Sequence, residues 1–232
     1  IGLASVCSAL GFKLIITMPK SMSIERQKIL KALGATLFLT PPELGMKGSI
    51  LKAKELANSI SNSFIPQQFE NQANPQTHRE STAKEILKDT NGKVDIFIAG
   101  SGTSGTITGV GEVLKKENPN IKIIIVEPKD SAILSGNPPS SHKIEGIGPG
   151  FIPSILNQNI YDEIIAVSSE DAMKTSRLLG KQEGLLVGIS SGANVFASLQ
   201  VANREENKGK MIVTLLCDTG ERYLSTKLYD DE

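Results

Sequence analysis

The chain has no tryptophan, and its few phenylalanines and tyrosines bring the aromatic content to only 4%. It therefore offers little of the stacking surface with which proteins hold single-stranded nucleic acid. Its 25 Lys and Arg residues are balanced by 25 Asp and Glu residues, so no net field draws it to nucleic acid or to an anionic membrane. No apolar run is long enough to cross a bilayer, and no signal peptide is visible. Neither nucleic acid nor membrane is a predicted partner.

Cysteine and histidine are also scarce. Two isolated cysteines, Cys7 and Cys217, predict reduced thiols in an intracellular protein rather than a disulfide framework. His78 and His142 have no partner at the spacing of metal ligands, so no metal site is predicted. We expect a cytoplasmic location. Organellar import stays open, because the chain begins at Ile1 without an initiator methionine.

The 232 residues, 39% of them hydrophobic, suffice for one large domain or two small ones with a real core. Segments typical of strands alternate with segments typical of helices along the chain, which predicts an α/β fold with mostly parallel sheets. A polar connection over residues 61–75 marks the expected boundary. We expect residues 1–69 to belong to a smaller domain and residues 70–232 to form a larger one.

A loop made only of glycine, serine and threonine follows the apolar run at residues 94–99, which is typical of a buried strand. A helical pattern begins at Thr106. Glycines let the backbone approach a bound group, and the free N–H groups at a helix start attract an anion. Thr103, Ser104 and Thr106 add hydroxyl donors to the same small volume. The loop therefore predicts a phosphate cradle.

The kind of phosphate stays open on these residues alone. Gly100-Ser-Gly-Thr-Ser-Gly105 satisfies the dinucleotide pattern G-x-G-x-x-G, and Glu127 ends the next apolar run at the distance that this pattern asks. The same spacing suits a P-loop, but Thr106 stands where that motif needs lysine, which argues against a nucleoside triphosphate. A dinucleotide site remains an alternative at this point.

Eight segments in unbroken order narrow the choice. They are residues 18–26, 31–35, 45–48, 67–71, 102–106, 142–148, 188–192 and 220–225. Together they resemble the cysteine synthase family, also called O-acetylserine sulfhydrylase. The resemblance covers essentially the whole chain. It implies a tryptophan-synthase-β-like fold of two three-layer α/β domains with mostly parallel sheets, and a pyridoxal 5'-phosphate cofactor between them. The smaller domain would then lie on the substrate side and the larger would bind the cofactor.

The same resemblance implies roles for ten residues. The cofactor phosphate would be held by the loop, where Ser104 replaces the usual glycine, and the pyridine nitrogen would face the hydroxyl of Ser190. Taken alone, Ser190 or Ser191 is also a plain helix cap. The cofactor-binding set is Gly102, Thr103, Ser104, Gly105, Thr106 and Ser190, and the substrate-binding set is Gln68, which would hold the substrate carboxylate, with Gly146, Ile147 and Gly148 in a mobile loop.

The implied activity is the synthesis of L-cysteine from O-acetylserine and sulfide, by β-elimination to aminoacrylate and β-addition of sulfide. Cystathionine β-synthase, β-cyanoalanine synthase and cysteine desulfhydrase activities use the same scaffold and stay open. A non-catalytic homologue that only binds a partner is an alternative of another class. The resemblance also implies a homodimer and binding of the C-terminal peptide of serine acetyltransferase.

Two family motifs do not occur in the chain. One, N-P-x-x-S-x-K, carries the lysine that forms the Schiff base with the cofactor, and the other is T-S-G-N-T-G. In the family the second directly precedes the residues that match Ile1 onward, and the helical pattern at Ile1 has no cap before it. We therefore expect that an N-terminal part is missing and name no catalytic residue. The 232 residues alone are predicted to be inactive.

Overall fold

The computed structural model describes residues 1–230, which divide into two compact units. The first unit comprises Ile1–Pro66 and the segment from Gly220 on, and the second comprises Gln67–Thr219. Among the residues described, no helix combines the length and the apolar character that a membrane crossing needs.

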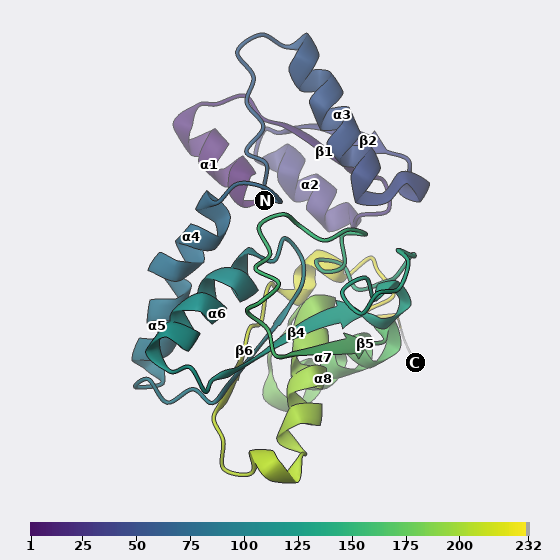
Figure 1. Cartoon of the computed structure of the whole chain (residues 1–232). Coiled ribbons are helices and arrows are strands. Elements are labelled where there is room, and N and C mark those ends of the chain that lie inside the picture. Colours follow the sequence, from purple (N-terminus) through teal and green to yellow (C-terminus); the bar gives the residue numbers. More distant parts are fainter. Residues whose placement is uncertain (231–232) are drawn as a thin grey trace. The chain divides into compact units, whose positions relative to one another are not determined.

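The first unit is built on a pair of parallel strands (Figure 1). Its elements are α1 (Gly2–Leu10), β1 (Ile15–Pro19), α2 (Ile24–Ala32), β2 (Thr36–Thr40), a 3₁₀ turn (Pro42–Leu44) and α3 (Gly45–Ser59). Ser23 caps α2, since its hydroxyl accepts a hydrogen bond from the Arg26 amide at 3.4 Å. A small core fills this unit, and it consists of Ala4, Met18, Leu30 and Ala35.

The described segment from Gly220 on is part of this first unit, whereas the sequence patterns place it with the larger domain. A 3₁₀ turn (Gly220–Tyr223) lies against α2, where the Arg26 guanidinium stands 5.9 Å from the centre of the Tyr223 ring. An Arg26 Nη2 donates to the Tyr223 hydroxyl at 3.3 Å, and the Ser225 hydroxyl donates to the Glu25 carboxylate at 2.7 Å. These contacts join segments about 200 positions apart, which local sequence patterns do not reveal.

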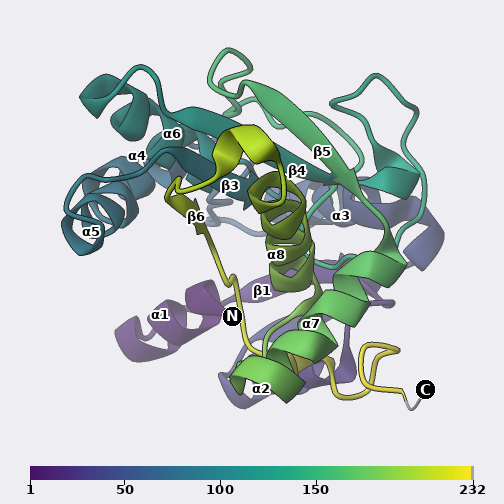
Figure 2. The same cartoon turned by 90° about the horizontal axis from the view of Figure 1, so that it is seen from below.

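The second unit is a four-stranded, fully parallel sheet in the order β5-β4-β3-β6. Helices cover both of its faces, with α6 on one and α8 on the other (Figure 2). This confirms the predicted α/β class with parallel sheets. The elements are α4 (Ala73–Glu80), α5 (Thr82–Asp89), β3 (Ile96–Gly100), α6 (Gly105–Glu117), β4 (Lys122–Pro128), β5 (Glu163–Val167), α7 (Ser169–Glu183), α8 (Ile189–Ala202) and β6 (Ile212–Thr214), with 3₁₀ turns at Lys129–Ser131 and Glu205–Asn207.

The central strands of this sheet are buried on both faces, as their unbroken apolar runs predict. Phe97 and Ile123 pack with Ile107, Val110 and other apolar residues of the cluster beneath α6. Alternate residues of β3 and β4 face the other way, towards α8, and are equally buried. The carboxyl end of β3 is thus held rigidly where the glycine-rich loop begins.

One predicted helix is in fact two. The pattern over residues 76–87 predicts a single helix, but α4 ends at Glu80 and α5 begins at Thr82. Ser81 between them has φ −117° and ψ −75°, well away from the values of a regular α-helix, about −63° and −42°. The break separates α4 from α5, and both helices pack against α6 (Figure 1). Helix α4 contributes side chains to the site.

Candidate functional site

The glycine-rich loop connects the end of β3 to the first turn of α6. The residue before α6, a helix of 13 residues, makes no side-chain capping bond in the described part of the chain, and the Gly105 amide donates to the Thr103 hydroxyl at 3.4 Å. The N–H groups that follow Gly105 at this helix start are available to an anion, as the sequence predicts. Thr103 and Thr106 are half-buried at this helix start, so their hydroxyls are accessible as further donors.

Ser104 is the residue before α6 and adopts a left-handed backbone with φ 67°. This conformation favours glycine and costs a residue with a side chain roughly 1 kcal/mol. The buried hydroxyl of Ser104 makes a 2.9 Å hydrogen bond with the hydroxyl of Ser101. The side chain thus braces the loop from inside, and its backbone N–H is the group left to meet an anion.

Helix α4 supports this loop through two side chains one turn apart, Asn74 and His78. The Asn74 amide donates to the hydroxyl of Thr103 at 3.0 Å, and His78 Nε2 lies 3.1 Å from the hydroxyl of Thr106. The sequence prediction names neither residue. The available signal was their i, i+4 spacing, which places both on one face of a helix.

Glycines in α6 allow α4 to come this close. A Cβ at Gly105 would lie 1.9 Å from Asn74 Oδ1, and a Cβ at Gly109 would lie 2.3 Å from the Pro75 carbonyl oxygen. Real side chains do not tolerate such distances. Gly105 is therefore fixed by the packing of α4, beyond any need of the loop itself.

Residues 146–148 pack directly on the glycine-rich loop. The Gly148 amide donates to the Ser101 carbonyl at 2.8 Å, and a Cβ at Gly102 would lie 2.4 Å from the Gly146 carbonyl oxygen. Gly146 and Gly148 have φ of +102° and +64°, conformations that only glycine adopts freely. The structure thus brings the two predicted glycine segments together.

Ser190 closes this arrangement from the start of α8. It is buried, and its hydroxyl oxygen would lie 3.2 Å from a Cβ placed on Gly146. The alternative in which Ser190 or Ser191 caps the helix is wrong, because Gly188 is the cap residue and, within residues 1–230, no side chain bonds there. The Ser191 hydroxyl instead accepts a hydrogen bond from the Cys217 amide at 2.8 Å.

Gln68 joins the same neighbourhood through its backbone. Its carbonyl accepts a hydrogen bond from the Asn74 amide at 2.8 Å, and the residue is exposed to solvent. The Asn74 side chain therefore bridges the Gln68 segment and the hydroxyl of Thr103. All ten residues predicted for the site belong to the second unit, and these contacts link its segments.

Glu127 has a structural task that removes the support for a dinucleotide site. Its carboxylate is buried and accepts hydrogen bonds from the backbone amides of Leu134 and Ser135 at 2.8 and 3.1 Å. The Ser135 hydroxyl donates to it as well, at 2.5 Å. The acid that would bind a ribose is thus fully engaged in ordering the loop after β4.

Comparison with known proteins agrees with this geometry. A family model described as pyridoxal-phosphate dependent enzyme matches residues 1–218. A cysteine synthase of Staphylococcus aureus is 55% identical over 230 residues, covering 99% of this chain and 74% of its own length. A crystal structure of cysteine synthase from Entamoeba histolytica superposes with a TM-score of 0.92 at 45% identity, covering 99% of this chain and 69% of that one. An O-acetylserine dependent cystathionine β-synthase from Helicobacter pylori gives a TM-score of 0.94 at 41% identity, over 98% and 74%.

The donors at the site fit pyridoxal phosphate. Uncapped helix amides and two hydroxyls suit a phosphate monoester, which offers only acceptors. A neutral serine hydroxyl at Ser190 can make a hydrogen bond with a pyridine nitrogen. Gly146 lies between these two groups, close to Gly102 on one side and to Ser190 on the other.

Proposed function

The chain belongs to the family of pyridoxal-phosphate dependent enzymes, and from that membership we propose that the protein is a cysteine synthase, making L-cysteine from O-acetylserine and sulfide. The 55% identity to a cysteine synthase over 99% of this chain is the observation that carries the proposal. The phosphate cradle between β3 and α6 supports it independently, because it supplies donors without the lysine of a nucleotide site.

Each part of the site has a task in this reaction. The amides of α6 that follow Gly105, with the hydroxyls of Thr103 and Thr106, would hold the phosphate. Ser190 meets the ring nitrogen with a neutral hydroxyl, which unlike a carboxylate does not hold a proton there by charge. Pyridoxal phosphate, once bound, would supply an electron sink for the substrate Cα. Gln68 would bind the substrate carboxylate.

The segment of Gly146, Ile147 and Gly148 would exclude water from the reacting atoms. The hydrogen bond from the Gly148 amide to the Ser101 carbonyl attaches this segment to the cradle, so its position depends on the loop that would hold the phosphate. We assign cofactor binding to the second unit, which also holds the four residues proposed for substrate contacts, Gln68, Gly146, Ile147 and Gly148. A homodimer in the cytoplasm that receives the C-terminal peptide of serine acetyltransferase completes the proposal.

A second activity on the same scaffold is cystathionine synthesis, favoured by the similarity to the Helicobacter pylori enzyme. The two are separated by incubating the holoenzyme with O-acetylserine and either sulfide or homocysteine, and by measuring both products. We expect cysteine to form with the higher kcat/KM. If cystathionine is the preferred product, the protein is a cystathionine synthase instead. If no acetate is released with either nucleophile, the non-catalytic homologue is the remaining alternative.

The cradle itself is tested by Thr106→Ala in the holoenzyme. Loss of a hydrogen bond to the charged phosphate is worth on the order of 1.5–3 kcal/mol, so cofactor affinity should fall about ten- to a hundredfold. Retention is measured by dialysis and absorbance. Unchanged retention would contradict a phosphate site at this loop.

A further inference from the structure

The two threonine hydroxyls of the cradle differ from ordinary surface hydroxyls, because side chains of α4 fix what each can do. At Thr103 the direction of the hydrogen bond with Asn74 is fixed. The Asn74 atom that faces Thr103 is the amide nitrogen, because the same atom also lies 2.8 Å from the Gln68 carbonyl, which can only accept. The Gly105 amide donates to the same hydroxyl oxygen at 3.4 Å. Both lone pairs of Thr103 are thereby used, and its hydrogen is left to donate outward.

At Thr106 the partner is a ring nitrogen that can act either way. His78 Nε2 lies 3.1 Å from the Thr106 hydroxyl, and Nδ1 lies 2.9 Å from the hydroxyl of Thr82 at the start of α5. Burial lowers the pKa of His78, which keeps the ring neutral with one N–H and one acceptor. If Nε2 were the acceptor, the hydrogen of Thr106 would point into α4 and be lost to a ligand.

A phosphate monoester resolves this choice, because at neutral pH it presents acceptors only. Resting on the proposed cofactor, we propose that His78 is a positioning residue that carries its proton on Nε2 and so turns the Thr106 hydroxyl into a phosphate donor. Thr82 then donates to Nδ1. The order runs in one direction, from Thr82 through His78 and Thr106 to a phosphate oxygen, and bonds aligned in this way strengthen one another.

Both hydroxyls are then oriented in the same way. Asn74 and His78, one helical turn apart on α4, each donate a hydrogen bond to a threonine hydroxyl, which leaves the hydroxyl hydrogen free to donate to the anion. The close approach of α4 that Gly105 and Gly109 permit is what makes both bonds possible. Thr82, four residues after His78, lies at Nδ1 across the break between α4 and α5.

Two substitutions of His78 in the holoenzyme distinguish the roles of its two ring nitrogens. In His78→Gln the amide nitrogen lies near the position of Nε2 and keeps a donor for Thr106. In His78→Asn the amide lies near Nδ1, and Thr106 loses its donor. We expect His78→Gln to retain pyridoxal phosphate within about threefold of the unmodified protein and His78→Asn to lose about tenfold or more. Thr77→Val is the matched control on α4, because among residues 1–230 its hydroxyl bonds within the helix alone, to the Ala73 carbonyl at 2.9 Å.

Two spectroscopic measurements accompany the retention assay. The ³¹P resonance of the bound cofactor should move in His78→Asn and stay in place in His78→Gln. In the unmodified holoenzyme the ¹⁵N shift of His78 Nε2 should be that of a protonated ring nitrogen. A proton found on Nδ1 would overturn the proposal, even if His78→Asn fails to fold.

The outcomes also keep this inference apart from the function on which it rests. If Thr106→Ala retains the cofactor fully, the cradle assignment fails. If Thr106→Ala loses it while His78→Gln and His78→Asn behave alike, the cradle stands and the role of His78 is refuted.

Discussion

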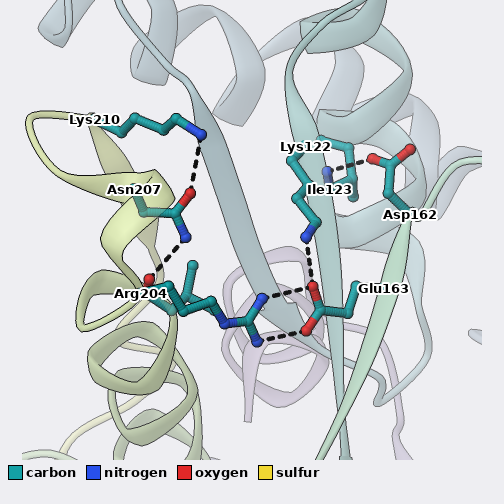
Figure 3. Close-up of polar contacts among 8 residues, drawn as sticks. Lys122, Ile123, Asp162, Glu163, Arg204, Asn207 and Lys210 are labelled. Atoms are coloured by element: carbon teal, nitrogen blue, oxygen red, sulfur yellow. Dashed lines mark hydrogen bonds and ion pairs between the residues drawn. The ribbon is translucent and has the colours of Figure 1, made fainter.

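An ion cluster at one end of the sheet, made by Arg204, Glu163 and Lys122, allows a test of how charge stabilises the second unit. Arg204, just after α8, grips the Glu163 carboxylate of β5 with two nitrogens, at 2.6 and 2.9 Å (Figure 3). Lys122 of β4 adds a third contact at 2.6 Å. These partners, Arg204 above all, lower the pKa of Glu163 from 4.5 to about 2 against the opposing effect of burial. The cluster thus ties α8 to two neighbouring strands.

The perturbation is Arg204→Met, which keeps much of the side-chain stem and removes the charge. The full depression of the Glu163 pKa corresponds to about 3 kcal/mol. The Glu163 side chain is 25% exposed and that of Arg204 is 30% exposed, so solvent screens part of this. We expect a loss of about 1 to 2 kcal/mol in the free energy of unfolding at pH 7.

The contribution of the Glu163 carboxylate to stability depends on pH in a defined direction. A carboxyl whose pKa is depressed by folding stabilises the fold above its unfolded pKa, near 4.5, and loses this contribution as the pH falls toward 2. The difference between the unmodified protein and Arg204→Met should therefore be full at pH 7 and shrink below pH 4.5. Urea unfolding followed by circular dichroism, at pH 7 and at steps down to pH 3, measures it.

The control is Lys208→Met, which removes the exposed pair of Lys208 with Glu205. Their side chains are 73% and 82% exposed, so the change should be below about 0.5 kcal/mol. A loss at pH 7 no larger than in this control would refute the reasoning. So would a difference that stays constant down to pH 3, because it would then come from packing and not from charge.

Three further predictions concern the site. Gly105→Ala should release the cofactor and lower the unfolding midpoint, since the new methyl group would overlap Asn74; an unchanged midpoint and unchanged retention would contradict the packing of α4 on α6. Ser190→Ala should slow acetate release from O-acetylserine at saturating substrate while the bound cofactor stays at full occupancy by absorbance, and normal turnover would remove Ser190 from the ring nitrogen. Cys217 is an exposed residue, but desolvation by the protein around its sulfur raises the pKa of the thiol, so its alkylation by iodoacetamide at pH 8 should be slower than that of free cysteine; an equal rate, read by peptide mass spectrometry, would speak against a desolvated thiol.

Features that depend on neighbouring residues could be predicted from the sequence. The apolar run before the glycine loop is β3, as expected. Ser168 caps α7 with its hydroxyl at 3.0 Å from the Asp171 amide, and a serine three residues before an acid is the sequence pattern of such a cap. The helix start at the glycine loop was also expected. In each case the cause lies within a few residues, where spacing and side-chain chemistry decide the backbone.

Features that depend on distant contacts could not be predicted. The break at Ser81 has no proline or glycine to announce it, and the docking of Tyr223 on Arg26 joins the two ends of the chain. Asn74 falls in the predicted polar connection over residues 61–75, and His78 reads as an ordinary polar residue of the predicted helix that follows. Only the fold shows that this helix lies against Gly105 and Gly109, about 30 residues further along the chain.

This explains why the loop sequence alone leaves two cofactors open. A glycine-rich turn into a helix provides amides for any phosphate, and the distinction comes from what surrounds it. Glu127, which a dinucleotide would need, is turned inward to the Leu134 and Ser135 amides. The Thr103 hydroxyl, by contrast, is held ready to donate by an asparagine from the preceding helix. The specificity of the cradle therefore lies as much in α4 as in the loop, and a loop of the same sequence without Asn74 and His78 behind it would bind the phosphate less tightly.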